Sequence, residues 1–226
     1  MKIGILLTGH AVPEMKDKLG DYDSMFVDLL SGRGYDFETW NVVDNEVPDS
    51  AAAADGWLIT GSKHGAYEDH AWIPPLEKLI REIQTREQPL VGVCFGHQII
   101  AQALGGTVEK FAGGWAVGPQ VYQFEGASIA LNAWHQDQVT RLPADAEVIG
   151  HNDFCAYAAL RLGDNTLTVQ AHPEYDSRAL DFLLKYRAPG VVPDQQIKQA
   201  MATLDTPLDS KRMADHMAAV FDRSTK

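Results

Sequence analysis

The chain has 226 residues, of which 45% are hydrophobic and 22% charged, and its net charge is −12. This composition is typical of a globular protein, and the negative charge disfavours nonspecific binding to nucleic acid or to an anionic membrane. No apolar segment approaches the length needed to span a bilayer, and the apolar start ends at Gly9, too early for a signal peptide. Two cysteines, Cys94 and Cys155, cannot form a disulfide framework, so we expect a cytoplasmic protein.

Apolar and amphipathic segments alternate in the first half of the chain. We expect strands at residues 2–7, 37–42, 57–59 and 89–93, and helices at residues 23–30, 72–83 and 97–104. This alternation is typical of a parallel sheet that is covered by helices on both faces.

The pattern changes after residue 106. Strands joined by turns are expected at residues 107–125, 129–131, 147–149 and 166–170, and helical spacing returns from residue 177 and over residues 195–221. We predict one domain at residues 1–188 and a C-terminal helical extension at residues 189–226, with the boundary marked by Pro189, Gly190 and Pro193.

The segment Gly92-Val93-Cys94-Phe95-Gly96 lies between an apolar strand and a helix. Gly-x-nucleophile-x-Gly at such a junction is typical of a nucleophile elbow, in which the glycines allow a tight turn and close backbone approach. The helix N-terminus would favour the thiolate form of Cys94. A small buried structural cysteine is the alternative, but the flanking glycines favour a nucleophile.

A thiol nucleophile needs a base, and the base needs a group that orients it. His172 follows the apolar strand at residues 166–170, and chemistry in parallel sheets gathers at the carboxyl ends of strands. Glu174 lies two residues further on, across Pro173, and in extended backbone it would lie on the same side as His172. A turn histidine beside a solvated glutamate is the alternative that spacing alone leaves open.

Taken together, Gly-Val-Cys-Phe-Gly-His-Gln at residues 92–98 and Ala-His-Pro-Glu at residues 171–174 resemble the class I (triad) glutamine amidotransferase family. Thr60-Gly61-Ser62 falls where that family has its oxyanion loop. Residues 134–139, Trp-His-Gln-Asp-Gln-Val, are similar to a segment of the GMP synthase amidotransferase domain, in which serine is commoner than the Trp134 found here. The resemblance covers residues 2–180 and implies a three-layer, flavodoxin-like α/β fold with a mostly parallel central sheet.

The resemblance also implies a role for each matching residue. Cys94 would attack a γ-glutamyl carbonyl, His172 would move the proton, and Glu174 would orient His172. The backbone N–H groups of Gly61 and Phe95 would hold the oxyanion. Substrate contacts are expected from three further residues: Gln98, Trp134 and His135.

Other polar residues carry weaker signals. His64, His70 and the pair Glu68-Asp69 match no metal motif by spacing, so we interpret them as a polar loop beside the site and expect neither a metal nor a cofactor. His97 would point away from the elbow thiol, because it is the i+3 neighbour of Cys94 along the helix. Cys155 and His10 are expected to be structural.

Two enzymatic interpretations share this chemistry. Either the chain releases ammonia from glutamine for a separate synthetase, or it is a free-standing γ-glutamyl hydrolase that acts on small γ-glutamyl compounds. The sequence contains no Ser-Gly-Gly-x-Asp-Ser pyrophosphatase loop and no Walker A loop, so the use of ammonia would require another polypeptide. These patterns favour the amidotransferase slightly. A third interpretation, a binding or regulatory protein on an inactive scaffold, is disfavoured because all three triad residues are present, and the oligomeric state is left open.

Overall fold

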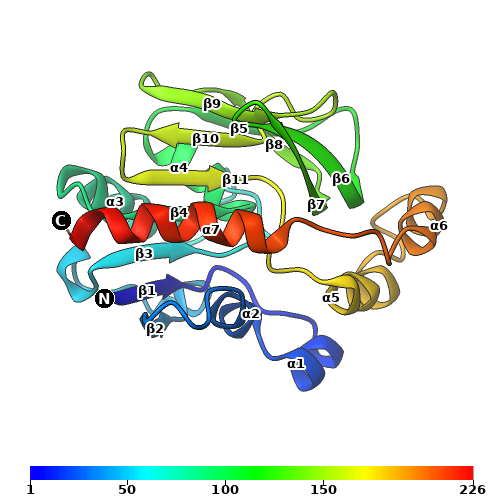
Figure 1. The fold of residues 1–226 in the computed structure, drawn as a ribbon, viewed down its shortest axis with the longest axis horizontal. Helices are drawn as coiled ribbons and strands as arrows, with labels where there is room; N and C mark the ends of the chain where they lie inside the picture. The colour runs from blue at the N-terminus through cyan, green and yellow to red at the C-terminus, as the bar shows by residue number, and fades with distance from the viewer. Residues whose placement is uncertain (226) are drawn as a thin grey trace.

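The computed structural model describes residues 1–225, which form three layers around one large sheet (Figure 1). The nine-stranded sheet has the order β2-β1-β3-β4-β11-β10-β9-β6-β7. Its first five strands are parallel: β2 (Asp36–Trp40), β1 (Lys2–Leu6), β3 (Gly56–Ile59), β4 (Leu90–Val93) and β11 (Thr166–Val169). The carboxyl ends of β3, β4 and β11 therefore lie next to one another at one edge of the sheet.

The rest of the sheet is antiparallel. It contains β10 (Ala159–Leu162), β9 (Ala146–His151), β6 (Ala116–Phe124) and β7 (Ala127–His135). Strands β5 (Thr107–Lys110) and β8 (Asp137–Arg141) pair in a separate antiparallel ladder.

Helices cover both faces of the parallel strands. On one face, α3 (Ile73–Thr85) and α4 (Phe95–Ala103) pack over residues such as Trp57, Ile59 and Leu90. On the other face, α2 (Tyr22–Leu29) and α7 (Ser210–Phe221) pack over residues such as Leu58 and Val91. Side chains of a strand point alternately to its two faces, so short, fully apolar strands are the expected sequence for this arrangement.

A third apolar cluster lies beyond the carboxyl ends of the strands. It joins α1 (Pro13–Leu19), α5 (Ser177–Phe182) with its π-helical continuation at Leu183–Arg187, and α6 (Asp194–Ala202). Short 3-10 turns at Val42–Asp44, Ala51–Ala53 and Asp222–Thr225 complete the described elements.

The observed elements differ from the expectation in several places. The helical stretch expected at residues 195–221 is two helices, α6 and α7, with residues 203–209 between them. The predicted strand at 107–125 is two strands, because the turn at Gly113-Gly114 interrupts it. Strands β8 and β10 were not predicted: β8 has one apolar residue, Val139, and β10 is only four residues long. Helix α1 was also missed, because Met15 is its only buried residue and the sequence has no apolar face there.

The predicted C-terminal extension contains α6 and α7. Helix α7 contacts β4 and β11, and Figure 1 shows it lying across the sheet. The division at residue 188 stays a prediction. Among residues 1–225, no helix is both long and apolar enough to cross a bilayer.

Met217→Ala is expected to destabilise the whole protein, because this α7 side chain is fully buried in the core with the sheet strands. The free energy of unfolding should fall by about 2–5 kcal/mol, the usual cost of such a cavity. Urea denaturation measures it, with the exposed Lys211→Ala on the same helix as the control. If α7 belonged to an independent appendage, Met217→Ala would leave the main unfolding transition unchanged.

Candidate active site

Cys94 lies at the junction of β4 and α4 in a strained backbone conformation. Its φ is 53° and its ψ is −103°, a region that L-residues rarely adopt and that clusters at functional sites. The Cys94 N–H donates to the Val169 carbonyl of β11 (2.8 Å), which fixes the start of the turn to the neighbouring strand. The predicted elbow at Cys94 is therefore the observed geometry.

The glycines on either side of Cys94 are required by close contacts. A Cβ at Gly96 would lie 2.3 Å from the Ile59 carbonyl oxygen, and a Cβ at Gly92 would lie 2.5 Å from Ile100 Cδ1. Helix α4 can approach β3 and β4 this closely only because neither position has a side chain.

His172 and Glu174 follow β11, the strand beside β4. His172 Nδ1 and Glu174 Oε1 are 2.7 Å apart, and both side chains are almost completely buried. Because Nδ1 is hydrogen-bonded to the Glu174 carboxylate, Nε2 is the ring nitrogen that can exchange a proton with a reacting group. The hydrogen bond that the sequence left open is present.

Two residues that the sequence did not indicate hold this pair in place. The Tyr175 ring stacks on the His172 imidazole, with centroids 4.1 Å apart and planes within 4°. Asn132 on β7 accepts the His172 N–H on its carbonyl (2.8 Å) and donates its side-chain amide to the Tyr175 carbonyl (2.9 Å). Tyr175 could have been found by its position next to Glu174, whereas Asn132 comes from a distant strand and gave no local signal.

Electrostatics keep a proton on His172. Burial alone would lower its pKa, but the Glu174 carboxylate and the neighbouring Cys94 outweigh burial and raise the pKa to about 10. His135 behaves in the opposite way, because burial lowers its pKa to about 4 and leaves it neutral.

Gly61 follows β3 and lies against both His172 and Cys94. A Cβ at Gly61 would be 2.9 Å from His172 Cε1 and 3.7 Å from the Cys94 Cβ. The preceding carbonyl, of Thr60, accepts hydrogen bonds from the Gly96 N–H (3.1 Å) and the Thr8 hydroxyl (2.9 Å). The peptide is trans, so the Gly61 N–H points away from these two donors.

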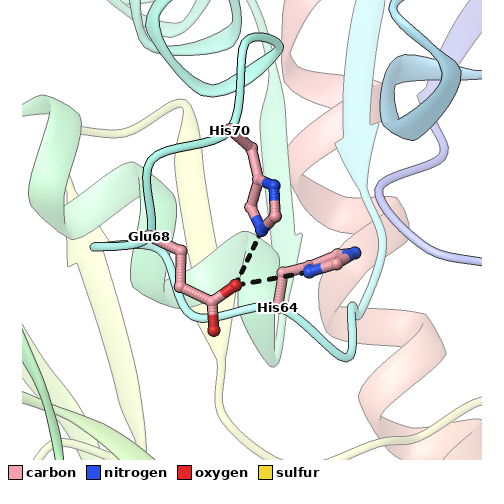
Figure 2. A group of neighbouring side chains, drawn as sticks. All are labelled: His64, Glu68 and His70. Carbon is pink, nitrogen blue, oxygen red and sulfur yellow. Dashed lines mark hydrogen bonds and ion pairs between the residues drawn. The ribbon is translucent and has the colours of Figure 1, made fainter.

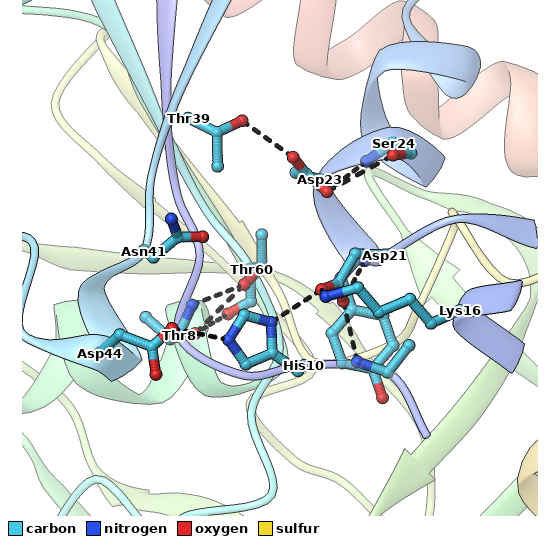
Figure 3. Close-up of polar contacts among 12 residues, drawn as sticks. Thr8, His10, Lys16, Asp21, Asp23, Ser24, Thr39, Asn41, Asp44 and Thr60 are labelled. Carbon is cyan, nitrogen blue, oxygen red and sulfur yellow. Dashed lines mark hydrogen bonds and ion pairs between the residues drawn. The ribbon is translucent and has the colours of Figure 1, made fainter. Parts of the chain in front are cut away.

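Thr8 and Thr60 fix the orientation of the Gly61 loop (Figure 3). Both are completely buried, and the Thr8 N–H donates to the Thr60 hydroxyl (3.0 Å). The Thr60 hydroxyl in turn donates to the Gly61 carbonyl (3.2 Å). Sequence reasoning missed Thr8, although its place directly after β1 was visible.

His10 belongs to an ion-pair cluster that anchors the loop after β1. Figure 3 shows its ring between Asp21 (2.7 Å) and Asp44 (3.0 Å), and Lys16 also contacts Asp21 (2.8 Å). Burial opposes the charge on His10, but both carboxylates raise its pKa. Its observed contacts are structural, as expected.

A cleft of about 160 Å³ opens beside Cys94. Its lining includes the three predicted substrate contacts, Gln98, Trp134 and His135. The Gln98 amide donates to the Asp137 carbonyl (2.9 Å) and to Gln170 Oε1 (3.1 Å), and the Trp134 carbonyl lies 3.9 Å from Cys94 Sγ. His135 Nδ1 lies 3.2 Å from the Asp137 carbonyl, so neutral His135 donates there and keeps Nε2 as an acceptor.

The two remaining candidates lie away from this arrangement. His97 is fully buried and bonds Thr168 Oγ1 through Nδ1 (2.8 Å), and burial lowers its pKa to about 3. Cys155 is buried too, and burial raises the pKa of its thiol to about 12.

Comparison with known proteins agrees with this geometry. The family model for glutamine amidotransferase class-I matches residues 16–184. The chain belongs to this family. Gamma-glutamyl peptidase 4 of Arabidopsis thaliana is 31% identical over 207 residues, which cover 84% of this chain and 82% of the relative. A glutamine-hydrolyzing GMP synthase subunit of Methanopyrus kandleri is 34% identical over 112 residues, which cover 43% of this chain and 57% of the relative.

The class I amidotransferase fold is likewise confirmed. The crystal structure of a glutamine amido transferase from Methylobacillus flagellatus superposes with a TM-score of 0.80 at 21% identity, covering 99% of this chain and 94% of that one. The sheet departs from the expected mostly parallel one only in its antiparallel half, from β10 to β7.

His172 is expected to stay protonated at neutral pH, since its pKa of about 10 lies above the usual 6.5. Because the folded state binds the His172 proton more tightly than the unfolded state does, protonated His172 adds to the free energy of unfolding. This contribution is complete below pH 6.5 and is lost as the pH rises through about 10. Nitrogen-15 NMR of labelled histidines should show His172 charged under conditions in which His97 and His135 are neutral.

Glu174→Gln should lower the pKa of His172, because it removes the charge that stabilises the imidazolium. In the same variant, the free energy of unfolding should fall less between neutral and alkaline pH than it does in the unmodified protein. Titration of His172 near the usual value of 6.5 in the unmodified protein would contradict the ion pair.

Proposed function

We propose that this chain is a cysteine-dependent hydrolase of γ-glutamyl amide bonds, with Cys94 as the nucleophile, His172 as the acid–base and Glu174 as the group that orients His172. The proposal rests on one observation, that the carboxyl ends of the neighbouring strands β3, β4 and β11 bring the reactive groups together. Cys94 in its strained turn, the buried His172–Glu174 pair and Gly61 lie together beside an open cleft.

In the first step, Cys94 Sγ attacks the γ-carbonyl carbon and the carbonyl oxygen becomes an oxyanion. The N–H groups of Gly61 and Phe95 receive it. Phe95 is the first residue of α4, so its N–H has no acceptor within the helix. The Gly61 N–H points away from the donors that hold the Thr60 carbonyl.

Before the attack, the proton of the Cys94 thiol resides on His172, whose raised pKa favours keeping it until the leaving nitrogen accepts it. The C–N bond then breaks, the amine leaves with the proton, and a γ-glutamyl thioester remains on Cys94. Water adds to the thioester with His172 as base, which releases glutamate and restores the thiol.

Acceptor atoms in the cleft suit the α-ammonium group of a γ-glutamyl substrate. Both N–H bonds of the Gln98 amide are used within the protein, so its oxygen is the atom it can offer to a ligand. Neutral His135 offers Nε2. The Trp134 ring supplies an apolar wall and packs edge-on against Trp115 (6.2 Å).

Basic residues on the cleft wall favour a substrate larger than glutamine. Lys63, Lys110 and Arg187 line the cleft of a protein whose net charge is −12. A γ-glutamyl peptide carries a second carboxylate beyond the scissile amide, and clustered cations of this kind would bind it. Together with the peptidase relative, which matches most of both chains, this supports a γ-glutamyl hydrolase of small peptides.

Glutaminase activity that supplies ammonia to a separate synthetase is the second candidate. The similarity to the GMP synthase relative favours it, although that match covers less than half of this chain. An inactive binding scaffold is disfavoured, because the cysteine, histidine and glutamate are all present and assembled.

The purified protein should hydrolyse γ-glutamyl dipeptides faster than glutamine when no partner is added. Cys94→Ala should lower turnover by at least about 1,000-fold, because no other thiol reaches the cleft. The matched control is Cys155→Ala, which should keep its activity. Release of glutamate is measured over a panel of dipeptides and glutamine.

Turnover of glutamine alone, and only with a synthetase present, would favour the second candidate. Activity that survives Cys94→Ala would contradict both.

Thr8→Val is expected to lower kcat on the order of tenfold with little change in KM, since it removes a hydroxyl that orients the Gly61 peptide but touches no substrate. Thr8→Ser keeps the hydroxyl and should keep most of the activity. Equal losses in both variants would instead indicate a packing defect.

A further inference from the structure

His64, Glu68 and His70 converge on the loop between β3 and α3 (Figure 2). His70 Nε2 lies 2.7 Å and His64 Nδ1 lies 3.3 Å from the same carboxylate oxygen, Glu68 Oε2. One ligand atom from each of the three residues lies within 4.8 Å of the other two. The fold produces this cluster, which the residue spacing did not predict.

These separations fit a small, four-coordinate metal ion. Zinc binds imidazole nitrogen and carboxylate oxygen at about 2.0–2.1 Å, so its tetrahedral ligands lie about 3.3–3.4 Å from one another. The separation from His64 to Glu68, 3.3 Å, is at that spacing, whereas the separation from His70 to Glu68, 2.7 Å, is shorter, so the His70 ring would have to move outward around an ion. A small adjustment of the two rings around an ion would complete three ligand positions.

Aromatic packing holds the two imidazoles in place. The His70 ring stacks on Trp72 with centroids 5.6 Å apart and planes within 8°, and the His64 ring lies 4.2 Å from the His70 ring. Trp72 is buried and packs against Phe95 (5.4 Å). Two ligands are thus held by a buried side chain that also contacts the residue after Cys94.

The cluster is open to solvent. The side chains are 21%, 42% and 32% exposed for His64, Glu68 and His70, so an ion can reach them.

We propose that His64, Glu68 and His70 bind one divalent transition-metal ion, with Zn²⁺ as the ion of choice. Two imidazoles and one carboxylate form a ligand set that suits zinc, and they leave a fourth position for water or a ligand carboxylate. His64 and Glu68 also line the cleft that contains Cys94. The metal therefore lies in the wall of the active-site cleft.

The proposal is tested by measuring zinc affinity in a protein that lacks the Cys94 thiol, because this thiol could bind the ion itself. The parent for the experiment is therefore the full chain with Cys94→Ala, stripped by chelator and titrated with Zn²⁺ against a chromophoric chelator. We expect one equivalent to bind. His64→Gln and His70→Gln, each in this parent, should weaken binding at least tenfold.

Three controls separate metal binding from folding. His151→Gln alters an exposed histidine on β9 and should bind zinc like the parent. Glu68→Gln removes the carboxylate and should also weaken binding. Added Zn²⁺ should raise the melting temperature of the parent but not of the His64 and His70 variants, whose metal-free melting temperatures should match the parent.

Cobalt gives an independent readout of the ligands. Co²⁺ in the parent should produce tetrahedral d–d absorption bands, and the His64 and His70 variants should lack them. Absence of stoichiometric zinc binding by the parent, or full binding by both histidine variants, would overturn the proposal.

Discussion

The hydrogen bond from the Gly96 N–H to the Thr60 carbonyl joins the loop after β3 to the turn after β4. It can form because Gly96 lets α4 approach the end of β3, where any side chain would collide with Ile59. Cys94 lies in its strained conformation two residues before this contact, and the trans peptide directs the Gly61 N–H away from the Thr60 donors. The position of the nucleophile and that of the adjacent N–H group therefore depend on one close approach of backbone to backbone.

Sheet topology brings the rest of the site to this point. Because β3, β4 and β11 are parallel neighbours, Gly61, Cys94 and His172 emerge at the same edge although they are far apart in the sequence. The antiparallel half of the sheet then returns β7 to this edge, where Asn132 clamps the turn that carries His172 and Glu174. The parallel strands place the reactive groups, and the antiparallel strands restrict their motion.

The sequence predicted the parts of the site that depend on local rules. Cys94 was recognisable from its flanking glycines, and His172 with Glu174 from a strand end and a proline. Asn132, Thr8 and the three residues around Glu68 act through contacts across the fold, which no local pattern contains. Strand β8 was missed for a similar reason, since its pairing with β5, rather than its own apolar content, makes it a strand.

Helix α7 has a consequence for how the protein is made. It covers β4 and β11, the strands that end at Cys94 and His172, and its buried residues lie in the same core as Val91, Val93 and Val169. Synthesis proceeds from the N-terminus, so these strands are complete on the ribosome well before residues 210–221 emerge. Until then the valine side chains of β4 and β11 lack the cover that α7 gives them. A nascent chain therefore passes through an interval in which its reactive thiol exists but its supporting strands still lack part of their cover.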